Sequence, residues 1–178
     1  MRMTPYFVSP ADTGILVLDS DGASEEMHIT VSGDPRPQQC PRSRVIHGRV
    51  MVFNPDVRIV ERFKTCVRMV LGITEYHPLV FPQGAYVKLD VHVKVRRPPS
   101  HYSRGGHLKP NLPLFPTTNG DVDNYDKFVM DGLQGIAYHD DRYVVNLQTS
   151  KAWAKGRAGK TKVVVRLVKD NNQNNGAI

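Results

Sequence analysis

The residues best suited to chemistry are four aspartates in the last third of the chain. Asp121 and Asp123 lie two residues apart in what should be extended chain, so both side chains can point the same way. Asp140 and Asp141 follow at the start of an expected strand, and a strand beside the first pair would bring Asp141 close. Three gathered carboxylates repel one another without a cation, and Mg²⁺ or Mn²⁺ prefers such oxygen ligands. A metal held there can activate water against a phosphodiester.

A helix predicted over residues 124–134 must position this pair. Asp123 is a good N-cap, and it recurs with Lys127 and Asp131 every four residues on the outer face. The opposite face is apolar at helical spacing and should anchor the helix: Tyr125, Phe128, Val129, Leu133 and Ile136.

Each acidic motif also has a purely structural interpretation. Asp-x-Asp-Asn before a helix is often only a cap, and Asp-Asp after a glycine turn is often only a turn. Lys127 could simply form an i,i+4 ion pair with Asp123 or Asp131. The combination of the motifs is much more specific than any one of them.

Together the motifs resemble a known signature. Asp-x-Asp-Asn-x-x-Lys at 121–127, Asp-Gly-Leu-x-Gly at 131–135 and Asp-Asp at 140–141 are similar to those of the RusA-like Holliday junction resolvases. The segments 33–37, 100–102 and 108–110 resemble those of phage and viral members. The chain departs from the family pattern at Tyr125, where the family has leucine, and at residues 119–120, where a basic residue and proline are usual.

The resemblance implies a homodimeric endodeoxyribonuclease that resolves four-way DNA junctions by paired symmetric cuts in recombination and repair. It implies Mg²⁺ as the cofactor, with Mn²⁺ as a substitute for it. It implies catalytic roles for Asp121, Asp123, Asp141 and Lys127, and metal ligation by the three aspartates with Asp140 assisting. Two rival functions stay open at this point. One is a structure-selective nuclease acting on flaps, forks or replication intermediates, and the other is a branched-DNA-binding protein without activity.

The charge of the chain favours a polyanionic partner. Its formal net charge is +7 and its estimated pI is about 9.5. Ten basic residues outside the motif are candidate contacts to the DNA backbone: Lys88, Lys94, Arg96, Arg97, Arg104, Lys109, Lys151, Lys155, Arg157 and Lys160. Tyr102 and Trp153 are better explained as packing aromatics than as platforms for bases.

The expected fold is α/β, of the α+β type, with a mixed sheet of about four or five strands packed against two main helices. Alternating or apolar runs predict strands over 27–32, 49–53, 85–96, 142–152 and 161–168. Asn54-Pro55 predicts the start of a long amphipathic helix that ends near Gly72. The expected organisation is an N-terminal extension over 1–26, an endonuclease domain over 27–169 and a disordered tail over 170–178. Residues 15–18 suit an edge strand within the extension.

The composition also bears on location. Cys40 and Cys66 lie in unrelated contexts and are expected to be free thiols in a reducing compartment. The sequence contains neither a run of about 20 apolar residues nor a signal-peptide pattern. These features predict a cytoplasmic protein without membrane contact, in the host cytoplasm if the source is a phage or virus.

Overall fold

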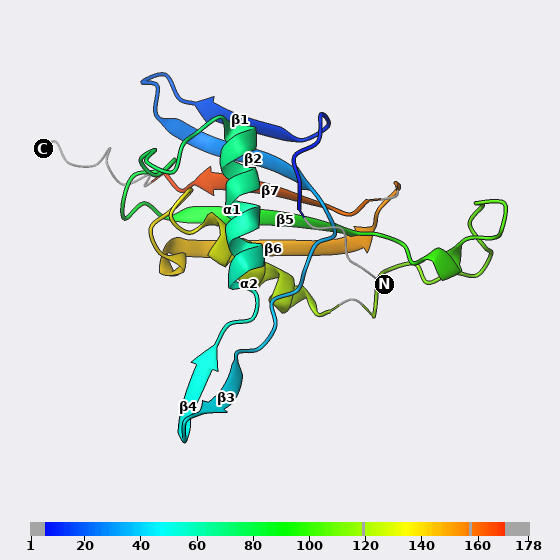
Figure 1. Cartoon of the computed structure of the whole chain (residues 1–178). Coiled ribbons are helices and arrows are strands. Elements are labelled where there is room, and N and C mark those ends of the chain that lie inside the picture. The colour runs from blue at the N-terminus through cyan, green and yellow to red at the C-terminus, as the bar shows by residue number, and fades with distance from the viewer. Residues whose placement is uncertain (1–5, 119, 157, 170–178) are drawn as a thin grey trace, which may run out of the picture.

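The fold is a mixed five-stranded sheet with both main helices on one face, in a computed structural model that describes residues 6–118, 120–156 and 158–169 (Figure 1). The elements in chain order are β1 (Thr13–Leu18), β2 (Ser24–Ser32), β3 (Arg42–Ile46), β4 (Arg49–Phe53), α1 (Val57–Leu71), β5 (Val87–Val95), η1 (Pro99–His101), α2 (Val122–Leu133), η2 (Asp141–Tyr143), β6 (Val144–Trp153) and β7 (Lys160–Leu167). This arrangement confirms the predicted fold class. The tail over 170–178 lies outside the described residues.

The strand order in the main sheet is β1-β2-β7-β5-β6. All neighbours are antiparallel except β5 and β6, which run parallel. A parallel pair needs a long crossover connection, and here that connection contains the loop 98–120 and α2. The crossover therefore places α2 over the sheet beside β6. Strands β3 and β4 form a separate hairpin that projects from the body (Figure 1).

The hydrophobic core lies between the sheet and the two helices. The alternation predicted for 85–96 is confirmed, because Val87, Leu89, Val91, Val93 and Val95 are all buried in β5. Three aromatic rings join the helices to the N-terminal segment: the centroid of Tyr6 lies 5.0 Å from Phe63 and 5.6 Å from Phe128.

The predicted N-terminal extension packs as part of this body. Its edge strand forms as β1 and pairs with β2 in the main sheet. Tyr6 is 1% exposed in the core, and its hydroxyl lies 3.5 Å from the Thr161 hydroxyl of β7. The described part of the extension, residues 6–26, thus contributes both a strand and a core side chain.

Both helices begin two residues away from their predicted caps. Asn54 does not cap α1; its side chain accepts a hydrogen bond from the backbone N–H of Asp56, and the helix starts after that turn. In α2 the N-cap is Asp121, and Asp123, the predicted cap, lies in the first turn. The end of α1 is as predicted, since Gly72 adopts the left-handed conformation (φ 69°) that suits a C-cap glycine.

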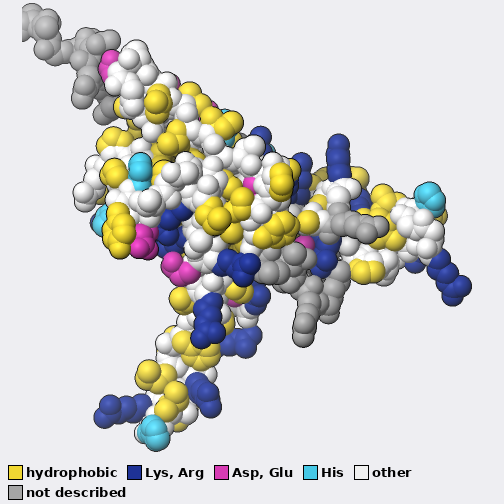
Figure 2. Space-filling view, turned by 45° about the horizontal axis from the view of Figure 1, so that its top comes forward, with side chains coloured by type: hydrophobic (Ala, Val, Ile, Leu, Met, Phe, Trp, Pro, Cys, Tyr) yellow, Lys and Arg dark blue, Asp and Glu magenta, His cyan; other side chains and the backbone are white. Residues whose placement is uncertain are grey.

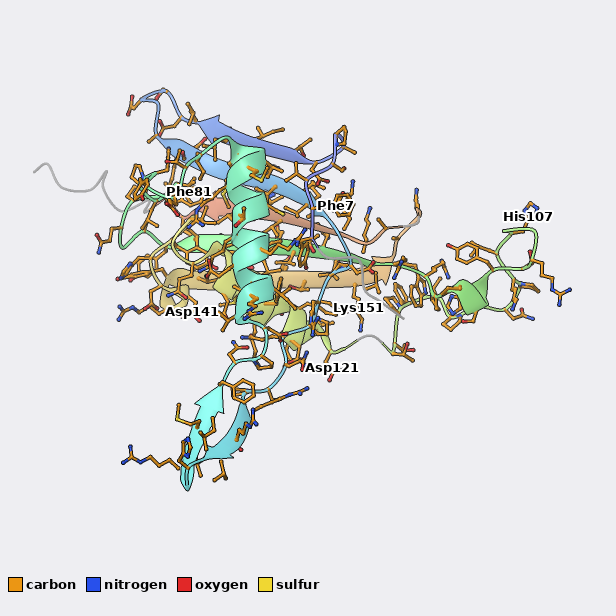
Figure 3. The ribbon with its side chains drawn as sticks, in the orientation of Figure 1. Phe7, Phe81, His107, Asp121, Asp141 and Lys151 are labelled. Carbon is orange, nitrogen blue, oxygen red and sulfur yellow. The ribbon has the colours of Figure 1, made fainter. Side chains whose placement is uncertain are left out.

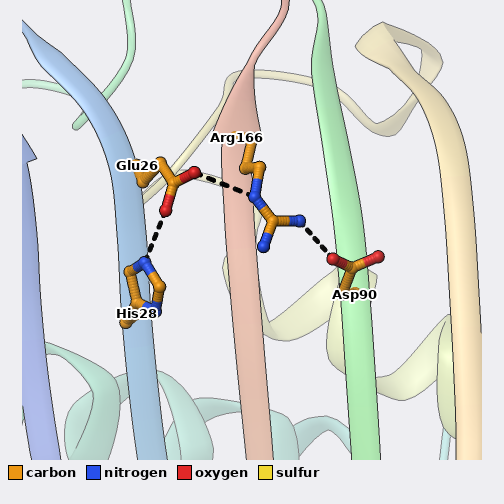
Figure 4. Close-up of polar contacts among 4 residues, drawn as sticks. All are labelled: Glu26, His28, Asp90 and Arg166. Carbon is orange, nitrogen blue, oxygen red and sulfur yellow. Dashed lines mark hydrogen bonds and ion pairs between the residues drawn. The ribbon is translucent and has the colours of Figure 1, made fainter.

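The sheet face turned away from the helices is polar. Arg166 of β7 joins Glu26 of β2 to Asp90 of β5, and Glu26 also contacts His28 at 2.7 Å (Figure 4). The hydrogen bond from His28, with that from Arg166, holds the pKa of Glu26 below its usual range. These ion pairs therefore neutralise part of the positive charge on this face.

Both cysteines are free thiols as predicted, with Cys40 exposed and Cys66 buried. None of the helices in the described ranges has the length and apolarity needed to cross a bilayer.

Candidate active site

The start of α2 presents two carboxylates to solvent. Asp121 is the N-cap residue in extended backbone (φ −83°, ψ 158°), and Asp123 follows in the first helical turn. Both are exposed, and the Asp121 side chain makes no capping hydrogen bond, so its oxygens are not used by the helix. The apolar face predicted for this helix is confirmed, since Tyr125, Phe128 and Val129 are each at most 2% exposed. Burial of that face forces the acidic face outward.

Lys127 lies one turn below Asp123 and contacts it. Its ammonium is 3.3 Å from Asp123 Oδ2, and both side chains are more than 60% exposed. Such an exposed i,i+4 pair contributes only about 0.3–0.5 kcal/mol to stability. The ion pair keeps the Lys127 ammonium within reach of any phosphate at the two carboxylates. Because the pair contributes so little to stability, Lys127 can exchange Asp123 for another anion.

The segment 33–39 lies against this helix start. A Cβ added to Gly120 would stand 2.5 Å from the Pro37 ring, so only glycine fits immediately before Asp121. The backbone N–H of Gln38 donates to the Asn124 carbonyl at 2.9 Å, and its side chain donates to Asp131 at 2.8 Å. Pro37 and Gln38 thus have a structural role in fixing α2.

Strand β6 secures the same helix from the sheet side. Lys151 donates to the Gly120 carbonyl at 2.6 Å and lies 6.0 Å from the centroid of the Tyr125 ring. Thr149 donates to the carboxylate of Asp126 in the second turn of α2. Burial raises the pKa of Asp126, with a further increase from the nearby Asp123 charge, while the Thr149 hydrogen bond opposes the shift.

Asp141 does not join the first pair in this structure. It opens η2 just before β6, whereas the contacts of Lys151 and Thr149 place the start of α2 beside the later part of β6. Figure 3 shows Asp121 and Asp141 at separate ends of this region. Asp140 caps η2 by accepting from the Arg142 N–H at 3.0 Å. Within the described residues there is no group of three His, Cys, Asp or Glu side chains close enough to hold a metal. The expected approach of Asp141 through the adjoining strand is therefore absent from the single chain.

Asp121 and Asp123 nevertheless have the chemistry that a divalent cation requires. Mg²⁺ is usually bound by one or two carboxylates, with waters and substrate phosphates as its other ligands. Two exposed carboxylates at a helix start fit that donor set, while the ligand roles of Asp141 and Asp140 stay predictions.

The basic residues predicted to bind DNA fall into three groups. Lys151 lies at the carboxylates, and Arg104 and Lys109 are exposed on the loop 98–118, the right-hand projection that carries His107 in Figure 3. Most others meet at the β6–β7 turn. Arg96, Arg97 and Lys155 line a cavity of about 540 Å³, and Lys94, Lys155 and Lys160 line a second of about 430 Å³. Lys88 lies apart on the polar sheet face, and Arg157 lies outside the described residues.

Of the two predicted packing aromatics, Trp153 packs against neighbouring side chains. The Trp153 indole N–H donates to the Pro113 carbonyl at 2.9 Å, and its ring contacts His101 edge-on at 5.1 Å. The Arg97 guanidinium lies 5.1 Å from the centroid of the same ring. Tyr102 lines the larger cavity. Trp153 thus holds the base of the loop against β6.

Two features near the site were missed in the sequence. Gln38 contacts α2, and nothing in its local pattern indicates that contact. Strand β4 was predicted over 49–53, but β3 and the pairing of the two strands were missed. The pairing was detectable, because His47-Gly48 separates two runs with alternating side chains and forms the turn with both φ angles positive (48° and 74°).

Comparisons with known proteins match most of the chain to one family. A family model described as "Endodeoxyribonuclease RusA" matches residues 32–167, which include the hairpin, both helices and every aspartate discussed above. The chain is also similar to an uncharacterized protein, YqaN, of Bacillus subtilis (strain 168). The two are 36% identical over 131 residues, which cover 71% of this chain and 87% of the relative.

Proposed function

Because the chain belongs to the RusA endodeoxyribonuclease family, we propose that it is a divalent-metal-dependent nuclease that resolves four-way DNA junctions in recombination and repair. The observation that supports this most is the pair of exposed carboxylates, Asp121 and Asp123, with two lysines beside them. A protein that only bound DNA would gain nothing from carboxylates that face the phosphates.

In the proposed reaction Asp121 and Asp123 would hold Mg²⁺, or Mn²⁺ in its place. The bound ion would activate water and offset charge on the leaving oxygen. Lys127 leaves Asp123 for the scissile phosphate and stabilises the negative charge that develops there. The free backbone N–H groups of the first turn of α2 favour the same anion. Lys151 keeps Gly120, and with it Asp121, in place. Asp141 and Asp140 are proposed as further ligands.

The proposed assembly is a homodimer. A two-fold axis would present two equal sites to the two symmetric strands of a junction, which explains how cuts could be paired. The basic residues of the loop 98–118 and of the β6–β7 turn would contact the phosphates of the arms.

The deciding experiment uses a labelled synthetic four-way junction, a linear duplex and a flap, each with Mg²⁺ and with EDTA. We expect paired symmetric nicks on the junction alone, abolished by EDTA. Asp123→Asn should keep junction binding and lose cutting, because the amide is a poor ligand for Mg²⁺.

Other outcomes would select the rival functions. Cutting of flaps or of all branched forms would retain the metal site and reject the resolvase assignment. Junction binding with no cutting in Mg²⁺ or Mn²⁺, and no effect of Asp123→Asn, would indicate a binding protein.

A further inference from the structure

The β3–β4 hairpin projects from the body beside the candidate site and is exposed along its whole length. All ten of its strand residues are exposed. Val45, Val50 and Val52 keep 67%, 68% and 69% of their surface, in contrast to the buried valines of β5. An isolated two-stranded hairpin is marginal in water without a packing partner. The hairpin therefore has a surface that is suited to contact with another molecule.

The hairpin grows directly from the segment that fixes α2. Pro37 packs on Gly120 and Gln38 bonds to Asn124, a few residues before β3 begins. On the return side, Asp56 accepts from Gln39 and pairs with Arg36 at 3.3 Å, which closes the base of the hairpin. Figure 3 shows Asp121 near this base. The hairpin therefore projects from a base that lies close to the carboxylates.

The strand register sorts the side chains of the hairpin into two faces. Arg42 pairs with Phe53, Arg44 with Met51, and Ile46 with Arg49, so all three arginines share one face. Ser43 and the three valines form the other face. Figure 2 shows Lys and Arg side chains among hydrophobic ones along this projection. The arginine face therefore presents three guanidinium groups, each opposite an exposed apolar side chain: Ile46, Met51 or Phe53.

The charge of this surface is not balanced locally. No Asp or Glu occurs between Asp34 and Asp56 in the sequence. Arg42 donates to the neutral side-chain amide of Gln39, and within the described residues no carboxylate forms an ion pair with Arg42, Arg44 or Arg49. Uncompensated guanidinium groups on an exposed ribbon are suited to a polyanion, and a two-stranded ribbon fits a DNA groove.

We propose that the β3–β4 hairpin is a DNA-binding arm, whose arginine face contacts phosphates of the DNA flanking the bond at Asp121 and Asp123. This inference rests on the proposed function for the identity of the anion. A second copy of the chain packed on the valine face is the competing occupant. DNA is favoured because a second copy would leave the arginine charge unexplained.

The test is junction binding by the full chain, measured by fluorescence anisotropy in EDTA over a range of salt concentrations. Arg44→Gln/Arg49→Gln should weaken binding by roughly three- to thirtyfold. It should also make the plot of log K against log[salt] shallower by about 0.9 for each phosphate that the protein no longer neutralises. Arg44→Lys/Arg49→Lys should restore most of the affinity and the slope.

The matched control is Arg68→Gln/Lys162→Gln, which removes the same charge at the end of α1 and on the polar sheet face. If this control weakens binding equally, the loss of net charge alone explains the effect, and the proposal is overturned. Unchanged binding by the arm variant would also overturn the proposal. The same holds if the arm variant binds weakly because it has lost cooperative thermal unfolding.

Separate measurements test the competing occupant of the hairpin, a second copy of the chain, and the proposed nuclease function. If Val50→Thr/Val52→Thr dissociates a dimer while the arginine variants bind normally, the hairpin is a subunit contact and the arm proposal fails. If the wild-type chain never cuts DNA but its binding depends on Arg44 and Arg49, the arm stands and the nuclease proposal fails.

Discussion

The ammonium of Lys151 donates a 2.6 Å hydrogen bond to the carbonyl of Gly120, the residue that immediately precedes Asp121. These residues are 31 positions apart in the chain, and the bond links the sheet to the N-cap of α2. It gives Lys151 a positioning role as well as a charge at the site.

Lys151→Met should lower both stability and cleavage. Loss of the bond should reduce the free energy of unfolding by about 1 kcal/mol, because the Gly120 carbonyl is left without that donor. The single-turnover cleavage rate should fall more than junction affinity does. Lys155→Met is the control, since this exposed lysine should affect DNA binding without changing urea unfolding. An unchanged cleavage rate in Lys151→Met would remove the positioning role.

Lys127→Met should separate catalysis from helix stability. As a donor to the developing charge, Lys127 should contribute on the order of 100-fold to the cleavage rate. Its exposed pair with Asp123 should contribute less than about 0.5 kcal/mol to stability. Single-turnover kinetics and thermal unfolding measure the two effects. If Lys127→Met cuts at the wild-type rate, the ion pair is all that Lys127 provides.

Asp126→Asn should stabilise the protein at neutral pH. Because burial raises the pKa of Asp126, folding disfavours its ionised form, and stability is lost as the pH rises above the ordinary aspartate pKa of about 3.9. Asparagine does not ionise and can still accept from Thr149. The melting temperature at pH 7 should rise by roughly 1–3 °C, and the difference in melting temperature between the variant and the wild type should disappear near pH 3. A gap that widens as the pH falls would contradict this assignment.

Gly132→Ala should destabilise the fold, although alanine favours helices. A Cβ at this position would stand 2.4 Å from Phe63 Cδ1, deep in the contact between α1 and α2. Overpacking of this kind costs about 1–3 kcal/mol, more than the helix propensity gained. In a Phe63→Leu background the same change should cost less, which a double-mutant cycle of urea unfolding would reveal. Equal costs in both backgrounds would rule out this clash as the cause.

The sequence by itself determined the features that depend on neighbouring residues. The helical spacing of Tyr125, Phe128 and Val129 required one buried face, so Asp123 and Lys127 had to face outward. The alternation in β5 likewise determined which of its side chains enter the core. These outcomes follow from backbone periodicity, which a single segment contains.

The tertiary structure alone decided which distant segments meet. The crossover from β5 to β6 sets the register that places Lys151, rather than Asp141, beside Asp121. The tertiary structure also placed Pro37 against Gly120 and left the β3–β4 hairpin outside the main sheet. Local pattern does not encode such contacts, because they depend on the path of the chain and on packing summed over the whole core.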